Sequence, residues 1–557
     1  MSIAVEHTSK PADEPAGTGA EPSSAEDAAA RLERELYEQV LVDKSPPWFR
    51  MSRRAAGWAT LLAVGLILLS RLPLHHTDLW GHLAYGRWMW QNGQVPRTEP
   101  LMPLAAGVPF VDTQWLPELL GYGLYRTLGP TALMFVHALM ICGVLALLLQ
   151  TLDARTAHAG FTLLALVAFL WLERFQLVIA RPQTLGLLCF ATLITLLVRR
   201  NRHAFWLVPL LFLVWANSHG SFSIGLAALT ASLVGDGLDA WRRSGRVAAL
   251  WRARRVRRKF VLLELAVIAT LINPYGLLMH LEVLRVAGNP NLADLVEWDP
   301  LVIRSGQGQA FFVVALLLIL LNRFSPRRMP AAEALWLLGL GVLTLWYSRG
   351  IVWWGFVAAM TLGGDAHAVW LRLRRRKPRM LSCRREGKWM LVTAGVAWIA
   401  FALTPFGNRV LHGRQPAIDR VVDDYTPVEA VAHLRQHPPV GQVFNTYEWG
   451  DYLLFAGPPG VEVFVASHAH LIPREVWVDY LATASVRADW DAILDQYGVN
   501  TVLVDYRYRR ALIRRLEDAA ATWKKTYDDG RAAVFTRIEP IRDEPADPAA
   551  APGQGNP

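Results

Sequence analysis

Apolar runs alternate with short polar segments over most of the chain. The first run covers residues 55–72 and the last covers residues 389–404. Between them lie runs at 131–150, 160–173, 183–198, 204–217, 221–236, 260–273, 309–322, 332–348 and 350–364. Several are short enough to be tilted or re-entrant. The pattern predicts a mainly α, polytopic membrane protein of about 11 transmembrane helices.

After about residue 404 the pattern changes to short apolar strands that alternate with helix-like stretches, which predicts a small α/β domain. No GxGxxG, Walker loop or nucleophile elbow occurs in it. The expected organisation is a disordered tail (1–30), a cytosolic amphipathic segment (31–54), a transmembrane domain (55–404) with an external loop (73–130), an extracytoplasmic α/β domain (405–540) and a second disordered tail (541–557).

The positions of the basic residues predict the topology. The net charge is +10, but Lys and Arg cluster at 199–202, 242–259, 323–328 and 372–385, all on the side of the N-terminus if the runs alternate. The positive-inside rule therefore places the N-terminus in the cytosol, and the loop and C-terminal domain outside a bacterial-type plasma (inner) membrane. The same placement argues against a nucleic-acid partner, and three cysteines give neither a disulfide framework nor a CxxC metal site.

The polar loop at 74–118 holds the first candidate chemistry. Its acids include Asp78, Asp112 and Glu118, and its histidines are His75, His76 and His82. An acid near a membrane face must be hydrated, paired or metal-bound, because burying an unpaired charge costs free energy. Two interpretations stay open for Asp78 and Asp112, which are helix N-capping and catalysis. The histidines lack a strong zinc spacing, which favours interfacial hydrogen bonding for them.

Further polar residues lie at the predicted outer ends of spans and in the C-terminal domain. Arg181, His219 and Arg349 would together form a pocket for an anionic head group, or individually snorkel or cap a helix. The C-terminal candidates follow two predicted strands, in NTYEWGDY (445–452) and SHAH (467–470). They are Glu448, Trp449, Asp451, Tyr452, His468 and His470. Ordinary strand-to-helix capping is the alternative for these residues.

This layout resembles that of the GT-C glycosyltransferases, integral membrane enzymes that use polyprenyl-phosphate-linked sugars. In that superfamily the first external loop carries an essential acid, and Asp78 occupies that place, with Asp112 as a later acid. The segment YEWGDY (447–452) resembles in composition, though not in order, the WWDYG motif of the oligosaccharyltransferase catalytic subunit. A clean Asp-x-Asp is absent from the loop.

The resemblance implies an inverting sugar transfer from a polyprenyl-phosphate-linked donor to an unknown extracytoplasmic acceptor. Asp78 would be the base, His82 would orient it one helical turn on, and Asp78 and Asp112 would be the ligands of a divalent cation, Mg²⁺ or Mn²⁺. The residues expected to bind substrate are His75, His76, Glu118, Arg181, His219, Arg349, Glu448, Trp449, Asp451, Tyr452, His468 and His470.

A function from another class stays open. A non-enzymatic transporter, flippase or scaffold of cell-envelope polysaccharide assembly would carry ionisable residues inside its spans. The apolar runs hold few such residues, and Glu264 and Glu333 lie near the ends of theirs, which favours the enzyme. The sequence does not separate transfer of a monosaccharide from ligation of an oligosaccharide.

Overall fold

The computed structural model describes residues 29, 32–33, 43–153, 155–156, 158–375 and 384–541. The tails predicted to be disordered, and nearly all of the amphipathic helix predicted at 31–42, lie outside the described residues. The chain forms two compact units, one of Met1–Gly57 with Cys383–Ala394 and one of Trp58–Ser382 with Gly395–Pro557.

The small unit is held by a short ladder and a carboxylate. Strand β1 (Met51–Ser52) pairs antiparallel with β2 (Arg385–Glu386) after the 3₁₀ turn η1 (Pro47–Phe49). The Asp43 carboxylate accepts hydrogen bonds from the backbone N–H groups of Ser45 and Gly387. Residues far apart in sequence are thereby joined within this unit.

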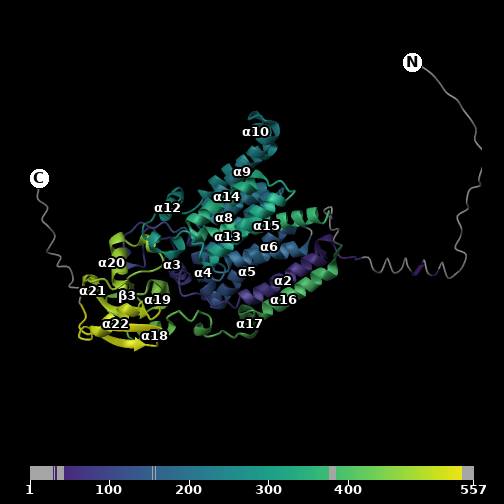
Figure 1. The fold of residues 1–557 in the computed structure, drawn as a ribbon. Coiled ribbons are helices and arrows are strands. Elements are labelled where there is room, and N and C mark those ends of the chain that lie inside the picture. The colour runs from purple at the N-terminus through teal and green to yellow at the C-terminus, as the bar shows by residue number, and fades with distance from the viewer. Residues whose placement is uncertain are drawn as a thin grey trace, which may run out of the picture. The chain divides into compact units, whose positions relative to one another are not determined.

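Every apolar run predicted from the sequence forms a helix (Figure 1). The helices are α2 (Arg53–Leu69), α5 (Pro130–Asp153), α6 (Ala159–Glu173), α7 (Pro182–Val198), α8 (Ala204–Ala216), α9 (Phe222–Ser244), α11 (Arg254–Thr270), α13 (Gly306–Phe324), α14 (Ala331–Trp346), α15 (Ile351–Leu373) and α16 (Gly387–Leu403). Among the described residues, α5, α9 and α13 are long and apolar enough to cross a membrane. Helix α16 with α17 (Pro405–His412), bent by 85°, adds a fourth candidate span. The mainly α, polytopic class is confirmed, while the count of eleven spans stays a prediction.

Helix α15 is the centre of the helical bundle. Its residues from Ile351 to His367 are buried, and it packs on α6, α13 and α14. Glycine allows this close approach, since a Cβ at Gly363 would lie 2.8 Å from Leu152 Cδ2 and 3.0 Å from Ala165 Cβ. Small residues are the usual means of close helix packing in membranes, where dispersion contacts replace the hydrophobic drive.

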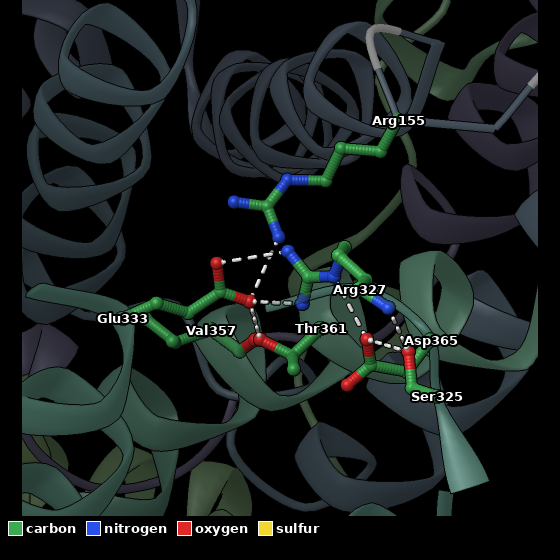
Figure 2. A network of polar contacts seen from close by, with 7 residues as sticks. All are labelled: Arg155, Ser325, Arg327, Glu333, Val357, Thr361 and Asp365. Carbon is green, nitrogen blue, oxygen red and sulfur yellow. Dashed lines mark hydrogen bonds and ion pairs between the residues drawn. The ribbon is translucent and has the colours of Figure 1, made fainter. Parts of the chain in front are cut away.

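An ion network lies at one end of the bundle (Figure 2). The Arg327 guanidinium donates to Glu333 and Asp365, each at 2.8 Å, and Arg155 Nη1 donates to Glu333 Oε1 at 2.8 Å. The Thr361 hydroxyl adds a hydrogen bond of 2.7 Å to Glu333. Buried charges persist where they are paired in this way.

The network bears on the transporter alternative, because Asp365 is an ionisable residue inside α15 that the apolar-run argument did not count. Its Oδ1 accepts from Arg327, and Glu333 is held by two arginines and a hydroxyl. These contacts tie the α13–α14 connection to α14 and α15. These charges therefore stabilise the packing of the helices at the start of α14. Arg349, a candidate site residue, follows the opposite end of that helix.

The loop after α2, predicted to be external, folds into two packed helices. Helix α3 (Leu79–Asn92) and α4 (Trp115–Leu128) are joined by a segment that contains η2 (Pro103–Ala105). Further short elements link the bundle helices, namely α10 (Ala248–Arg252), α12 (Leu278–Ala287), η3 (Leu292–Asp294), η4 (Val296–Trp298) and η5 (Ser348–Gly350). Glycine allows α3 and α4 to approach, because a Cβ at Gly86 would lie 3.0 Å from Tyr122 Cβ.

The C-terminal segment forms a mixed five-stranded sheet with helices, as the sequence predicts (Figure 1). The strands lie in the order β4 (Glu462–Val463), β3 (Gln442–Asn445), β5 (Val499–Asp505), β7 (Ala532–Arg537) and β6 (Trp523–Asp528). The first three are mutually parallel, and β7 pairs antiparallel with β5 and β6. The helices are α18 (Val428–Gln436), α19 (Gly450–Ala456), α20 (Arg474–Ala484), α21 (Trp490–Gln496) and α22 (Arg510–Asp518), with turns η6 (Ile418–Arg420), η7 (Tyr447–Trp449) and η8 (Ala469–Leu471).

Helix α19 packs on α3, so the C-terminal domain and the loop that contains α3 share one apolar core. The core includes Trp80 and Tyr85 of α3 together with Trp449 and Tyr452. The Trp80 and Tyr452 rings meet edge-to-face with centroids 5.2 Å apart. This packing brings the acids of the loop next to the residues that follow the strands.

Candidate active site

Asp78 occupies the N-cap position of α3 but does not cap it. Its side chain makes no capping hydrogen bond, and its backbone has φ 44° and ψ −61°. A non-glycine residue at positive φ is strained, and such strain concentrates at functional sites. The carboxylate instead pairs with Arg181, with Asp78 Oδ2 and Arg181 Nε 2.5 Å apart. Of the two interpretations left open by the sequence, capping does not describe Asp78.

The predicted arginines Arg181 and Arg349 meet on one carboxylate. Arg181 donates two hydrogen bonds to Glu297, at 3.0 and 2.8 Å, and Arg349 Nε lies 3.6 Å from Glu297 Oε2. The Arg349 guanidinium also donates to Gln183 and lies over the Trp298 ring. Burial raises the pKa of Glu297, but Arg349 and Arg181 outweigh it and lower the pKa to about 2.

The two arginines differ in how open they are. The Arg181 side chain is 10% exposed and held by carboxylates from two elements, whereas Arg349 is 29% exposed and Glu297 is 42% exposed. Burial lowers the pKa of Arg181, yet Asp78 and Glu297 together raise it above its ordinary value. Arg181 therefore fixes Asp78, and Arg349 is the cation with an accessible guanidinium.

A second cluster lies behind Asp78, around His82. Its Nδ1 is 2.7 Å from Glu118 Oε1, and its ring meets the His468 ring edge-to-face. Burial lowers the pKa of His82 against the opposing charges of Asp78, Asp451 and Asp112, so the imidazole is neutral at pH 7. Asp78, Asp451 and Asp112 thus all lie within electrostatic reach of His82.

Burial governs the acids of this cluster. It raises the pKa of Glu118 to about 8, and it raises the pKa of Asp112 well above its ordinary value with a further contribution from Glu118. It raises the pKa of Asp451 to about 6, with a contribution from Asp78. Carboxyl pairs that share a buried site hold a proton between them. One Asp112 oxygen also accepts from the N–H of Gln114, the N-cap residue of α4, so Asp112 forms a local turn before the helix and does not cap it.

Glycine on α3 makes room for the C-terminal domain. A Cβ at Gly81 would lie 2.7 Å from Asp451 Oδ1, so glycine leaves room for the Asp451 carboxylate against α3. The other Asp451 contact is a hydrogen bond of 3.0 Å from the Ser467 N–H, which fixes the carboxylate beside α3. Asp451 is the C-terminal acid that the structure brings to the loop.

Other predicted site residues lie elsewhere. Trp449 and Tyr452 are buried in the shared core, where the Trp449 indole donates to the Tyr425 carbonyl; their predicted role in substrate binding stays a prediction. His75 and His76 both contact Asp423, with Nδ1 atoms 3.1 and 2.7 Å from Oδ2. His219 is half-buried beside Ser221, and desolvation lowers its pKa to about 3.

The remaining predicted residues flank the cluster. The His470 ring lies tilted against the His468 ring with centroids 5.6 Å apart, and burial lowers the pKa of His470 to about 4. Glu448 lies at the far side of η7, where one of its oxygens is buried without a hydrogen-bond partner.

Two residues at the site were not in the predicted set. Glu297 joins the two arginines, and its place in an acidic, aromatic segment on the predicted outer face was the available signal. Tyr447 lies within electrostatic reach of Asp78. Burial and the charges of Asp78 and Asp451 raise the pKa of Tyr447 well above its ordinary value. Its hydroxyl donates to the Ser467 carbonyl at 3.2 Å. Nothing in the local sequence distinguished Tyr447 from other strand-flanking tyrosines.

Two groups of described residues have the geometry to hold a metal ion. They are His82 with Glu118 and His468, and His75 with His76 and Asp423, in each of which the ligand atoms lie within 4.8 Å of one another. Neither group contains Asp78 or Asp112, the ligands that the sequence predicted. Two imidazoles and a carboxylate suit Zn²⁺ or Mn²⁺, whereas Mg²⁺ prefers oxygen ligands.

The fold is similar to solved structures of membrane enzymes. The Archaeoglobus fulgidus oligosaccharyltransferase with a tethered acceptor peptide matches at a TM-score of 0.49 and 11% identity, over 87% of this chain and 74% of that chain. ArnT from Cupriavidus metallidurans bound to undecaprenyl phosphate matches at 0.49 and 14% identity, over 86% of this chain and 97% of that chain. An oligosaccharyltransferase is thus among the structures that this chain resembles, as the sequence predicted. No family model and no curated protein sequence matches the chain.

The buried carboxyl of Glu118 predicts a pH dependence of stability. Its pKa is raised to about 8, so the folded state binds more protons than the unfolded state above pH ~4.3, and stability falls as pH rises toward 8. Histidines of the unfolded chain are neutral above about pH 6.5, which isolates the carboxyl contribution. The free energy of unfolding of the wild type should fall as pH rises from ~6.5 to ~8. In Glu118→Gln this fall should be smaller by roughly 1–2 kcal/mol.

The measurement is thermal unfolding of the purified protein in detergent with a chelator present, at several pH values in that interval. Glu462→Gln, at an exposed position of β4, is the control and should keep the wild-type slope. An unchanged slope for Glu118→Gln would mean that Glu118 is ionised in the folded protein.

Proposed function

We propose that this protein is a membrane glycosyltransferase that moves a sugar from a polyprenyl-phosphate-linked donor to an extracytoplasmic acceptor. The observation that carries the proposal concerns Asp78. Its carboxylate makes no capping hydrogen bond and pairs with Arg181, next to the more exposed Arg349. A fixed carboxylate and a nearby cation are what inverting transfer from a phosphate requires.

In the proposed reaction, Asp78 accepts the proton of the acceptor nucleophile. The acceptor atom then bonds to the anomeric carbon, while the bond from that carbon to the phosphate oxygen breaks. The lipid phosphate leaves with the electron pair, and positive charge stabilises it. Arg349 is the group proposed to contact the phosphate, because its guanidinium is the more exposed and Glu297 already shows that an anion fits between the arginines.

The divalent cation would be held by other residues than the Asp78 and Asp112 that the sequence predicted. His82, Glu118 and His468 would hold Mn²⁺ or another borderline divalent ion, and Mg²⁺ fits this set poorly. When bound, such an ion supplies positive charge that stabilises a developing phosphate charge. Without it, His82 and Glu118 keep a neutral hydrogen-bonded pair behind Asp78.

A turnover assay tests the proposal. Purified protein in a bilayer mimetic should release polyprenyl phosphate from a polyprenyl-phosphate-linked sugar in the presence of an extract of envelope acceptors. Release of lipid phosphate without transfer to an acceptor would indicate hydrolysis. Movement of the intact lipid-linked sugar across vesicles, with no release, would favour the flippase alternative.

The orientation is a separate prediction. The N-terminus should lie in the cytosol and the C-terminal domain outside a bacterial plasma membrane. The reason is that the basic segments all fall on the side of the N-terminus if the spans alternate. In a background with Cys383→Ser, a membrane-impermeant thiol reagent added outside should label Asp518→Cys and should miss Ser244→Cys. Both positions are exposed at helix C-termini, α22 and α9. The reverse pattern would place the loop and the domain in the cytosol and remove the proposed donor.

A further inference from the structure

The carboxyl ends of β3 and β5 lie at a topological switch point of the sheet. Strand β3 has β4 on one side and β5 on the other, all parallel, so the chain leaves the sheet in opposite directions at the β3–β5 pair. Open α/β sheets bind ligands at this topological switch point. Here Thr446 and Asp505 tie the two strand ends together, with Oγ1 and Oδ2 3.1 Å apart.

Two charged side chains at this edge keep unused polar atoms. Glu448 follows β3 and Arg509 follows β5, and Glu448 Oε2 and Arg509 Nε are both buried without a hydrogen-bond partner among the described residues. The nearest fixed contact of Arg509 is a long hydrogen bond of 3.4 Å to the Tyr480 hydroxyl. Buried polar groups ordinarily find partners, so these atoms have a partner that the chain itself does not supply.

The two charges lie close together. Burial lowers the pKa of Arg509, but Tyr480, Glu448 and Asp505 outweigh it and raise the pKa above the ordinary value. Glu448 offers an acceptor and Arg509 a donor, and their opposite charges leave the place between them nearly neutral. A ligand that fits such a place carries both donors and acceptors and no net charge.

Aromatic side chains border the same edge. Tyr425 and Tyr508 meet edge-to-face with centroids 6.0 Å apart, and the Arg507 guanidinium lies over both rings. The Tyr508 side chain is exposed, so its ring can pack against a ligand. The Tyr425 ring also contacts His76, at 4.6 Å between centroids, and His76 is two residues from Asp78.

We propose that Tyr425, Glu448, Tyr508 and Arg509, at this strand edge, bound a crevice that binds a neutral sugar unit of the acceptor. A pyranose presents hydroxyl groups that donate and accept, and apolar C–H faces that pack on aromatic rings. An anionic ligand would be repelled by Glu448. The inference rests on the proposed function, because it makes the acceptor a carbohydrate whose binding unit lies on the Tyr425 path toward Asp78.

The experiment measures binding of neutral sugars to the full-length protein without donor. The protein is purified in an amine-oxide detergent, because maltoside detergents would compete, and maltose, cellobiose and lactose are tested by saturation-transfer NMR and calorimetry. At least one should bind. Glu448→Ala should weaken binding about ten- to a hundredfold, as expected for a lost charge-assisted hydrogen bond, and Tyr508→Ala should weaken it about tenfold.

Tyr508→Ala keeps the test valid if Glu448→Ala fails to fold, because Tyr508 is exposed. The control is Glu429→Ala, an exposed glutamate of α18, which should bind as the wild type does. The proposal is overturned if none of the sugars binds, or if Tyr508→Ala binds as well as the wild type. Sugar binding without turnover would reject the enzyme and keep the crevice, and turnover without sugar binding would do the reverse.

Discussion

Asp78→Asn should fold normally and lose about 10²–10⁴ of its turnover. Loss of a general base typically has an effect of this size. Asparagine matches aspartate in volume and serves equally well as an N-cap, so a capping role would leave activity intact. The structure already removes capping, because Asp78 makes no cap hydrogen bond and pairs with Arg181 instead. Release of polyprenyl phosphate by the purified variant is the measurement.

The matched control is Asp299→Asn, an exposed acid just after η4 on the same predicted face. It should retain wild-type turnover. Asp112→Asn should lose less than Asp78→Asn, because one Asp112 oxygen serves a local backbone hydrogen bond that asparagine can keep. An active Asp78→Asn protein would remove Asp78 as the base, and with it the observation that carries the proposed function.

Arg181→Ala should lower both stability and turnover. The change leaves Asp78 and Glu297 without their shared cation, and breaking a buried ion pair costs about 3–5 kcal/mol. Because Glu297 is 42% exposed, solvent offsets part of that loss, and we expect about 2–3 kcal/mol. Turnover should fall as well, since Asp78 loses the contact that fixes its carboxylate. Thermal unfolding in detergent and the phosphate-release assay measure the two effects.

Arg349→Ala separates positioning from phosphate binding. Arg349 is 29% exposed and 3.6 Å from Glu297, so its loss should change stability little and raise the Michaelis constant for donor about tenfold. Arg285→Ala is the control, because Arg285 is 70% exposed and makes a long ion pair with Glu282, at 3.7 Å. If Arg181→Ala proves as stable as the control, the Asp78–Arg181–Glu297 cluster is not an ion network in solution.

Several features of the protein follow from local sequence alone. Each apolar run became a helix, and the strand pattern after residue 404 became a sheet with helices. Hydrophobic periodicity depends only on residues close together in the sequence, so it predicts secondary structure without knowledge of the fold. The concentration of acids and histidines in the first loop was visible for the same reason. Asp78 lies outside α3, at its N-cap position with φ 44°, and His82 pairs with Glu118.

The tertiary structure decided which of these side chains act together. Asp78 and Arg181 lie 103 positions apart, and Arg181 and Glu297 lie 116 apart, so only packing of α3, α7 and η4 could show that they pair. The sequence also placed Trp449 and Tyr452 at a binding surface, where the packing of α19 on α3 buried them. Local pattern fixes which face of an element is apolar. Which charged groups find partners depends on contacts between distant elements, because a buried charge is stable only beside its counter-charge.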